Sequence, residues 1–388
     1  MADIRYADRL LILKNSSSIA VAEKAAALKK QGKEVIDLSW GEPDIKTPEN
    51  IVNAGIEALK KGYTRYTNSR GILELREAIA NKLKNENGVS YDPNTEIFVT
   101  PGGKQAILYA LLAFINKGDE VLLIDPSWLS YEDMVNLCEG VAVPVPTRPE
   151  ENFKIHISEI KKRITPKTRA IIINNPCNPT GMAIDRAELE ELAKIAAEHN
   201  IFVISDEIYE KILFDGRSFT SMAAINGMRE RTILINGFSK SYAMTGLRIA
   251  YIAAPKNIVS NMIKLQQHSA SSAASVSQYM ALEALTGPQD FLPKLNKLYE
   301  TRRDYFDVKI KTVPGFSWVR PQGTFYGMLN TSKFAKNSLE ASNILLDRFC
   351  IATVPGSAFG ASGENHIRVC LIIENNIMDK VFECLRQL

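Results

Sequence analysis

Short runs of consecutive apolar residues recur through the middle of the chain, and each ends at a polar or turn-forming residue. The runs show no polar alternation, which is typical of strands buried on both faces. Because such strands belong to parallel sheets covered by helices, the pattern predicts an α/β fold with a mostly parallel sheet and helices on both faces. The predicted strands are 97–100, 121–124, 170–173, 202–205, 232–235 and 249–253.

Helical spacing of apolar residues appears between these strands, at 104–116 and 186–199. The first fifty residues and the stretch from about residue 290 are richer in helical patterns, with long charged segments at 294–309 and 338–348. We therefore predict a large domain over 51–289. Both chain ends, 1–50 and 290–388, are expected to form a smaller α/β domain.

Composition narrows the function. The 388 residues include 47 Lys and Arg against 44 Asp and Glu, so the net charge is only +3. This near-neutral balance argues against a nucleic-acid or membrane-surface protein. The longest apolar run, 106–115, is too short to span a bilayer. The N-terminus lacks the apolar core of a signal peptide, so we expect a soluble, cytoplasmic protein.

Histidine and cysteine point away from a metal enzyme. The four histidines are scattered, and the five cysteines form no Cys-x-x-Cys motif. No zinc-binding spacing is present, so we predict no metal site. With so few histidines, a histidine-based triad is also unfavoured. If the protein is an enzyme, another group should carry the chemistry.

Unusual residues follow five successive predicted strands. Ligands of open α/β sheets bind at the carboxyl ends of the strands, so these residues are expected to share one crevice. In chain order they are Gly102-Gly103-Lys104, Trp128, Asn178, Asp206 with Tyr209, and Ser239-Lys240.

Each of these residues also has a purely structural interpretation. The glycines could form turns, and Trp128 could belong to the core. Asp206 could cap a helix, and Lys240 could be a solvated charge. The combination at consecutive strand ends favours a ligand site over these alternatives.

The residue types indicate which ligand. Gly103 and Lys104 open a helix whose free N–H groups suit a phosphate, and Ser239 and Arg248 could complete that site. The chain has neither a P-loop nor a Rossmann glycine motif, so a nucleotide is not supported.

The other residues suit a flat aromatic cofactor. Trp128 offers a stacking surface, and the Asp206 carboxylate could hold a ring nitrogen protonated. Asn178 and Tyr209 could donate to a phenolate oxygen, and Lys240 could form a Schiff base with an aldehyde. Phosphate, pyridine ring, phenolate and aldehyde together describe pyridoxal 5′-phosphate.

With these residues in place, the sequence resembles the class I pyridoxal-phosphate aminotransferases of fold type I, within the bacterial aspartate aminotransferase branch. The motifs that carry the resemblance span nearly the whole chain. They are Gly41-Glu42-Pro43-Asp44, the segment 66–76, Gly102-Gly103-Lys104-Gln105, Asn178-Pro179-Thr180-Gly181, the segment 205–209, the segment 239–248, and His366-Ile367-Arg368.

The resemblance implies a role for each matched position. Lys240 is the Schiff-base lysine, Asp206 partners the pyridine nitrogen, and Tyr209 belongs to the catalytic set. Tyr66 reaches the phosphate of a neighbouring subunit, which implies a homodimer with shared active sites. The cofactor-binding set is Gly103, Lys104, Trp128, Asn178, Asp206, Tyr209, Ser239, Lys240, Arg248 and Tyr66, and the substrate-binding set is Gly41, Trp128, Asn178, Arg368, Lys14 and Lys104.

The implied reaction is amino-group transfer between an amino acid and a 2-oxo acid. Lys14 and Lys104 favour aspartate and 2-oxoglutarate, with prephenate as a further substrate. The sequence departs from the family pattern at 14–15, 247, 271–274 and 369–371, without losing a catalytic group. The alternatives are an aminotransferase for neutral or aromatic amino acids and a pyridoxal-phosphate lyase of the same fold.

Overall fold

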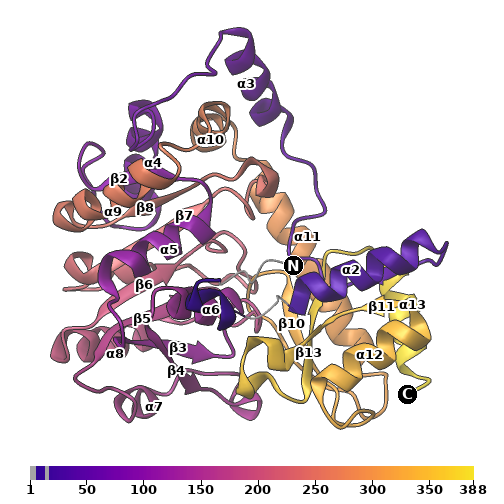
Figure 1. Ribbon diagram of the computed structural model, residues 1–388. Helices are drawn as coiled ribbons and strands as arrows, with labels where there is room; N and C mark the ends of the chain where they lie inside the picture. Colours follow the sequence, from indigo (N-terminus) through magenta and orange to yellow (C-terminus); the bar gives the residue numbers. More distant parts are fainter. Residues whose placement is uncertain (1–5, 14–16) are drawn as a thin grey trace.

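The computed structural model describes residues 6–13 and 17–388 (Figure 1). Its helices are α1 (Asp8–Leu11), α2 (Ser17–Lys30), α3 (Glu49–Lys60), α4 (Leu73–Glu86), α5 (Gly103–Phe114), α6 (Ser130–Leu137), α7 (Ile157–Lys161), α8 (Arg186–Glu198), α9 (Lys256–Ser269), α10 (Ser275–Thr286), α11 (Phe291–Ile310), α12 (Ser338–Phe349) and α13 (Asn375–Leu385). In the described residues, no helix is both long and apolar enough to cross a membrane.

A seven-stranded sheet forms the centre of the larger part of the molecule. Its strands are β2 (Ile97–Thr100), β3 (Glu120–Asp125), β4 (Val141–Pro146), β5 (Thr168–Asn174), β6 (Phe202–Asp206), β7 (Thr232–Gly237) and β8 (Ala250–Ala253). They lie in the order β2-β8-β7-β6-β5-β3-β4, and β8 alone runs against its neighbours. The predicted α/β fold with a mostly parallel sheet is confirmed. The sequence pattern did not predict the edge strand β4.

Both faces of this sheet are buried, which explains the unbroken apolar runs. In β5, Ala170 and Ile172 pack into a core with α5, α6 and α9. Ile171 and Ile173 point to the opposite face and pack with α8. The first turn of α8 is fixed by Asp185, whose carboxylate accepts a hydrogen bond from the N–H of Glu188 in a capping box.

The two ends of the chain meet in smaller sheets. The short strand β1 (Ile36–Asp37) pairs in parallel with β11 (Ile351–Ala352). The strands β9 (Trp318–Val319), β10 (Tyr326–Asn330), β12 (Val354–Pro355) and β13 (His366–Cys370) form an antiparallel sheet in the order β12-β13-β10-β9. This arrangement supports the proposed pairing of 1–50 with 290–388, while the boundaries at 50 and 290 stay a prediction.

Helix α11 contributes side chains to three hydrophobic clusters in turn. Phe291 packs beside the core of α4 and α10, and Tyr299 is buried with Phe325. Phe306 lies in the C-terminal core with Phe382. The helix therefore joins the region around the large sheet to the region built from the chain ends (Figure 1).

The loop after β5 is held against the segment that leads into β10. The Gly181 carbonyl accepts hydrogen bonds from the N–H groups of Gln322 and Gly323, at 2.8 and 2.9 Å. Gly181 has a φ of +71°, and a Cβ there would lie 2.6 Å from both Pro321 and the Tyr326 carbonyl oxygen. Only glycine fits this close approach.

We predict that Gly181→Ala destabilises the fold more than Gly62→Ala does. Gly62 has a similar φ of +73°, but a Cβ there would meet nothing within 4 Å. The control should cost ~1–2 kcal/mol from its left-handed backbone. Gly181→Ala should add ~1–3 kcal/mol from overpacking. Urea unfolding of both variants measures the difference, and equal costs would contradict the close-packed interpretation.

Candidate active site

A cavity of about 400 Å³ lies at the carboxyl ends of the parallel strands. Its walls come from the large sheet and from the segments near both chain ends. Eleven of the residues proposed from the sequence line it: Gly41, Gly103, Lys104, Trp128, Asn178, Asp206, Tyr209, Ser239, Lys240, Arg248 and Arg368. The expected convergence of strand ends is present in the structure.

Lys240 follows β7 and extends into this cavity. Its ammonium donates a hydrogen bond to the carbonyl oxygen of Gly41, from the segment after β1. Burial lowers the pKa of Lys240 to about 8. A substantial fraction of the side chain is therefore a neutral amine at mildly alkaline pH, and only the neutral amine is a nucleophile or a base.

Asp206 ends β6 and is buried. Its Oδ2 accepts a hydrogen bond from the Tyr131 hydroxyl at 2.7 Å, and its Oδ1 accepts one from the N–H of Ile208 at 3.2 Å. Burial raises the pKa of Asp206 to about 6, against the opposing effect of the Tyr131 hydrogen bond. Residues 208–211 form a turn and no helix follows Asp206, so the helix-cap interpretation of Asp206 is wrong.

One end of the cavity is built for an anion. Gly103 begins α5, so the first N–H groups of that helix have no helical partners. Gly102 has a φ of +88°, and a Cβ there would lie 2.6 Å from a guanidinium nitrogen of Arg248. The glycine thus lets Arg248 lie beside the helix start. Ser239 lines the same cavity.

Lys104 and Trp128 lie together in the cavity wall. The Lys104 ammonium is 5.0 Å from the centre of the Trp128 ring. The pKa of Lys104 is lowered, first by burial and then by the charge of Arg248. The Trp128 ring also meets Tyr131 edge-on, at 5.3 Å between ring centres.

Arg368 on β13 is a buried cation. Only 4% of it is exposed, and it makes no ion pair with any described residue. Its guanidinium donates to the Asn178 side-chain oxygen at 3.1 Å and to the Ser39 carbonyl at 2.6 Å. Its Nε is buried without a partner. A buried cation with a free donor favours an anionic ligand, because an unpaired buried charge is costly.

The remaining predicted residues fall into three groups. Asn178 holds Arg368, and the Tyr209 hydroxyl lies 3.2 Å from the Tyr326 hydroxyl. Tyr66 is 90% exposed and does not line the cavity, so its role toward a neighbouring subunit stays a prediction. Lys14 lies outside the described residues.

Sequence reasoning missed several residues that line the cavity, among them Ser39, Trp40, Tyr131 and Tyr326. Ser39 and Trp40 directly precede the Gly41 motif, and Tyr131 follows Trp128 by three residues at a helix start. Their closeness in sequence to residues already proposed for the site could have identified them. Tyr326 carries no local signal, because the pairing of β10 with β13 brings it to the site.

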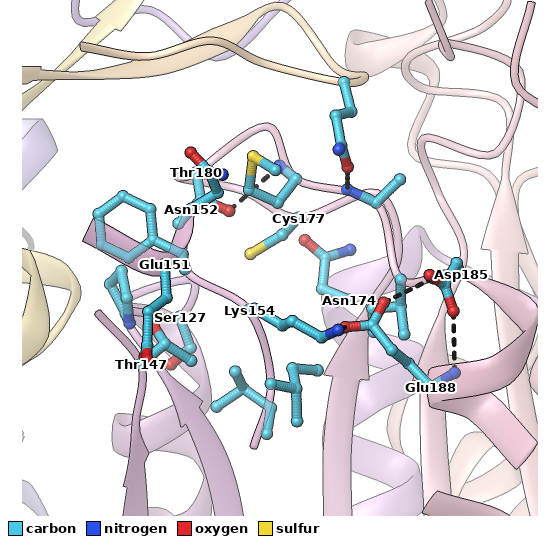
Figure 2. A pocket seen from close by; sticks show the side chains of 18 of the residues that line it. Ser127, Thr147, Glu151, Asn152, Lys154, Asn174, Cys177, Thr180, Asp185 and Glu188 are labelled. Carbon is cyan, nitrogen blue, oxygen red and sulfur yellow. Dashed lines mark hydrogen bonds and ion pairs between the residues drawn. The ribbon is translucent and has the colours of Figure 1, made fainter. Parts of the chain in front are cut away.

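A second cavity of about 260 Å³ adjoins this site, and Figure 2 shows residues that line it. Tyr131 and Asn174 line both cavities, so they form part of the wall between them. Its other lining residues include Lys154, Cys177, Thr180, Asp185 and Glu188.

Comparisons with known proteins agree on the family. Residues 33–385 match the family model "Aminotransferase class I and II". The chain is 42% identical to an aspartate aminotransferase of Bacillus sp. (strain YM-2) over 97% of each chain. It is also 42% identical to aromatic-amino-acid aminotransferase 2 of Thermococcus litoralis over 86% of each chain.

Solved structures agree as well. The aspartate aminotransferase from Thermus thermophilus with maleate superposes with a TM-score of 0.95, at 37% identity and 99% coverage of both chains. This protein belongs to the class I and II aminotransferase family.

Proposed function

We propose that this aminotransferase binds pyridoxal 5′-phosphate in the cavity and transfers amino groups between aspartate and 2-oxoglutarate. The observation that carries the proposal is the convergence of Lys240, Asp206 and the buried, unpaired Arg368 on one cavity. The aspartate aminotransferases of Bacillus and Thermus support the choice of substrate.

The residues present fit this cofactor. The start of α5, Ser239 and Arg248 would hold a phosphate, and the Gly102 backbone leaves room for Arg248 beside it. The Trp128 ring would stack on a pyridine ring, and Asp206 would face its nitrogen. Asn178 and Tyr209 would donate to its phenolate oxygen.

Pyridoxal phosphate, when bound, supplies an aldehyde that condenses with amines and a ring that accepts an electron pair. Lys240 would attach to that aldehyde. Once displaced by the substrate's amine, its amino group would take the proton from the substrate α-carbon. A pKa of about 8 suits both tasks, because the neutral amine is available near physiological pH.

We predict that Lys240→Ala abolishes covalent attachment of the cofactor and essentially all turnover. Borohydride reduction followed by mass spectrometry measures the attachment, and a coupled assay measures amino transfer. Lys211→Ala is the control, because that lysine pairs with Glu86 away from the cavity. A Lys240→Ala variant that still retains the reducible linkage would refute the assignment.

The substrate's α-carboxylate would bind Arg368 through two guanidinium N–H groups. A dicarboxylic substrate needs a second cation for its far end, and Lys104 lies in the same cavity. The Thermus relative was solved with maleate, a dicarboxylate, which supports such a substrate. Lys14 remains a proposed second contact.

We predict that Lys104→Ala weakens kcat/KM for aspartate more than for phenylalanine, since only aspartate has a second carboxylate. A lost buried charge contact costs ~2–5 kcal/mol. Lys117→Ala, beyond the other end of α5, should change neither value. Equal losses on both substrates would overturn the dicarboxylate proposal.

An aromatic amino acid is the second candidate substrate. Trp40 lines the cavity and is half exposed, and its indole N–H is fixed on Asp37 at 2.7 Å. The Thermococcus relative named for aromatic amino acids also favours this reading. A panel of amino donors with 2-oxoglutarate separates the two candidates. The same panel detects a lyase, which would release ammonia instead of forming glutamate.

We also propose that the protein is a cytoplasmic homodimer with shared active sites. Helix α3 buries Ile51, Gly55 and Ala58 against the molecule. Its other face exposes Val52, Ile56 and Leu59, spaced as one helical stripe. The exposed Tyr66 lies a few residues further along. An apolar stripe of this kind favours burial against a second copy.

We predict that Ile56→Glu shifts the protein toward monomers and lowers activity, because a charge would be buried in the interface. Sedimentation velocity measures the mass, and activity is assayed on the separated species. Val308→Glu, at an exposed apolar position on α11, is the control. A fully active wild-type monomer would contradict the shared-site dimer.

A further inference from the structure

The Tyr131 side chain has one hydrogen bond in the described structure, and it goes to Asp206. We propose that Tyr131 is a positioning residue that holds the Asp206 carboxylate ionised and correctly oriented. The inference rests on the proposed function, in which Asp206 partners the cofactor's ring nitrogen.

The geometry fixes both oxygens of the carboxylate. The Tyr131 hydroxyl donates to Oδ2 at 2.7 Å, and the N–H of Ile208 donates to Oδ1 at 3.2 Å. The side-chain amide of Asn174 donates to the Asp206 carbonyl at 3.0 Å, which holds the backbone. Tyr131 therefore supplies the one side-chain hydrogen bond to this carboxylate that the described residues show.

Tyr131 is itself held in a defined place. It lies in the first turn of α6, is 1% exposed, and meets the Trp128 ring edge-on. Its side chain also lines both cavities. Packing thus fixes the ring, and the hydrogen bond to Asp206 gives the buried hydroxyl its partner.

The other titratable groups that face Asp206 cannot replace this contact. They are Cys177 from the loop after β5, Tyr209 from the turn after β6, and Lys240 after β7. No hydrogen bond joins any of the three to the Asp206 carboxylate in the described residues. Without the Tyr131 hydroxyl, the pKa of Asp206 should rise further above its present value of about 6.

Tyr131→Phe keeps the ring and removes only the hydroxyl. Tyr109→Phe is the matched control, since Tyr109 is also 1% exposed and its hydroxyl lies 2.6 Å from the Ser269 hydroxyl, away from the site. In the purified enzyme, Tyr131→Phe should lower kcat about ten-fold and weaken cofactor binding, with little change in KM. Its loss of kcat should grow as the Asp206 carboxylate becomes protonated below neutral pH. Tyr109→Phe should show none of these changes.

A second measurement does not depend on catalysis. A buried carboxylate whose pKa is raised on folding stabilises the fold when protonated, and that stability is lost as pH rises through the folded pKa. In protein stripped of cofactor, the melting temperature of Tyr131→Phe should therefore fall further below wild type between pH 6 and pH 8. The difference in melting temperature between Tyr109→Phe and the wild type should stay constant with pH.

Asp206→Asn serves as the control background, because it removes the carboxylate that titrates. In that background, adding Tyr131→Phe should leave the pH dependence of melting unchanged. Wild-type kcat in Tyr131→Phe, or a pH-independent deficit equal to that of Tyr109→Phe, would overturn the inference. If pyridoxal phosphate does not bind at all, the proposed function fails, while the melting experiment still tests the Tyr131–Asp206 pair.

Discussion

The common direction of six strands in the large sheet is the constraint on which the site depends. Because parallel strands end at the same edge, residues as far apart in sequence as Gly103 and Lys240 reach one cavity. The single reversed strand, β8, leaves this edge intact, since it lies between β2 and β7 and those two strands still run in parallel. The chemistry is then supplied by short loops that a buried sheet holds in place.

Much of this arrangement could be predicted from the sequence. Unbroken apolar runs such as 170–173 identify strands with two buried faces, and the residue types after them identify the chemistry. The pattern could not give the direction of β8, because apolar content is the same in either direction. Nor could it identify β4, whose exposed edge position includes two prolines and an exposed valine.

The parts of the site that escaped prediction depend on tertiary pairing. Tyr326 enters through the antiparallel register of β10 with β13, and no local spacing encodes that register. Ser39 enters the site through its backbone, since its carbonyl oxygen accepts a hydrogen bond from the Arg368 guanidinium. Every residue has a backbone carbonyl, so its use as a hydrogen-bond acceptor cannot be predicted from the residue type. The role of Tyr66 stays a prediction, because this exposed residue does not line the cavity of a single chain, and Lys14 lies outside the described residues.

Helix α11 has a consequence for how the molecule comes apart. Its side chains belong in turn to the core of α4 and α10, to the cluster around Tyr299 and Phe325, and to the C-terminal core with Phe382. Partial unfolding of the chain ends would strip one end of this helix of its packing, and an isolated helical turn has little stability of its own. Because α11 packs into all three hydrophobic clusters, unfolding one cluster destabilises its neighbour. Unfolding is therefore cooperative across regions whose sheets are separate. Partly unfolded forms with an exposed α11 should accordingly be rare, so a protease should cleave this helix only slowly in the native protein.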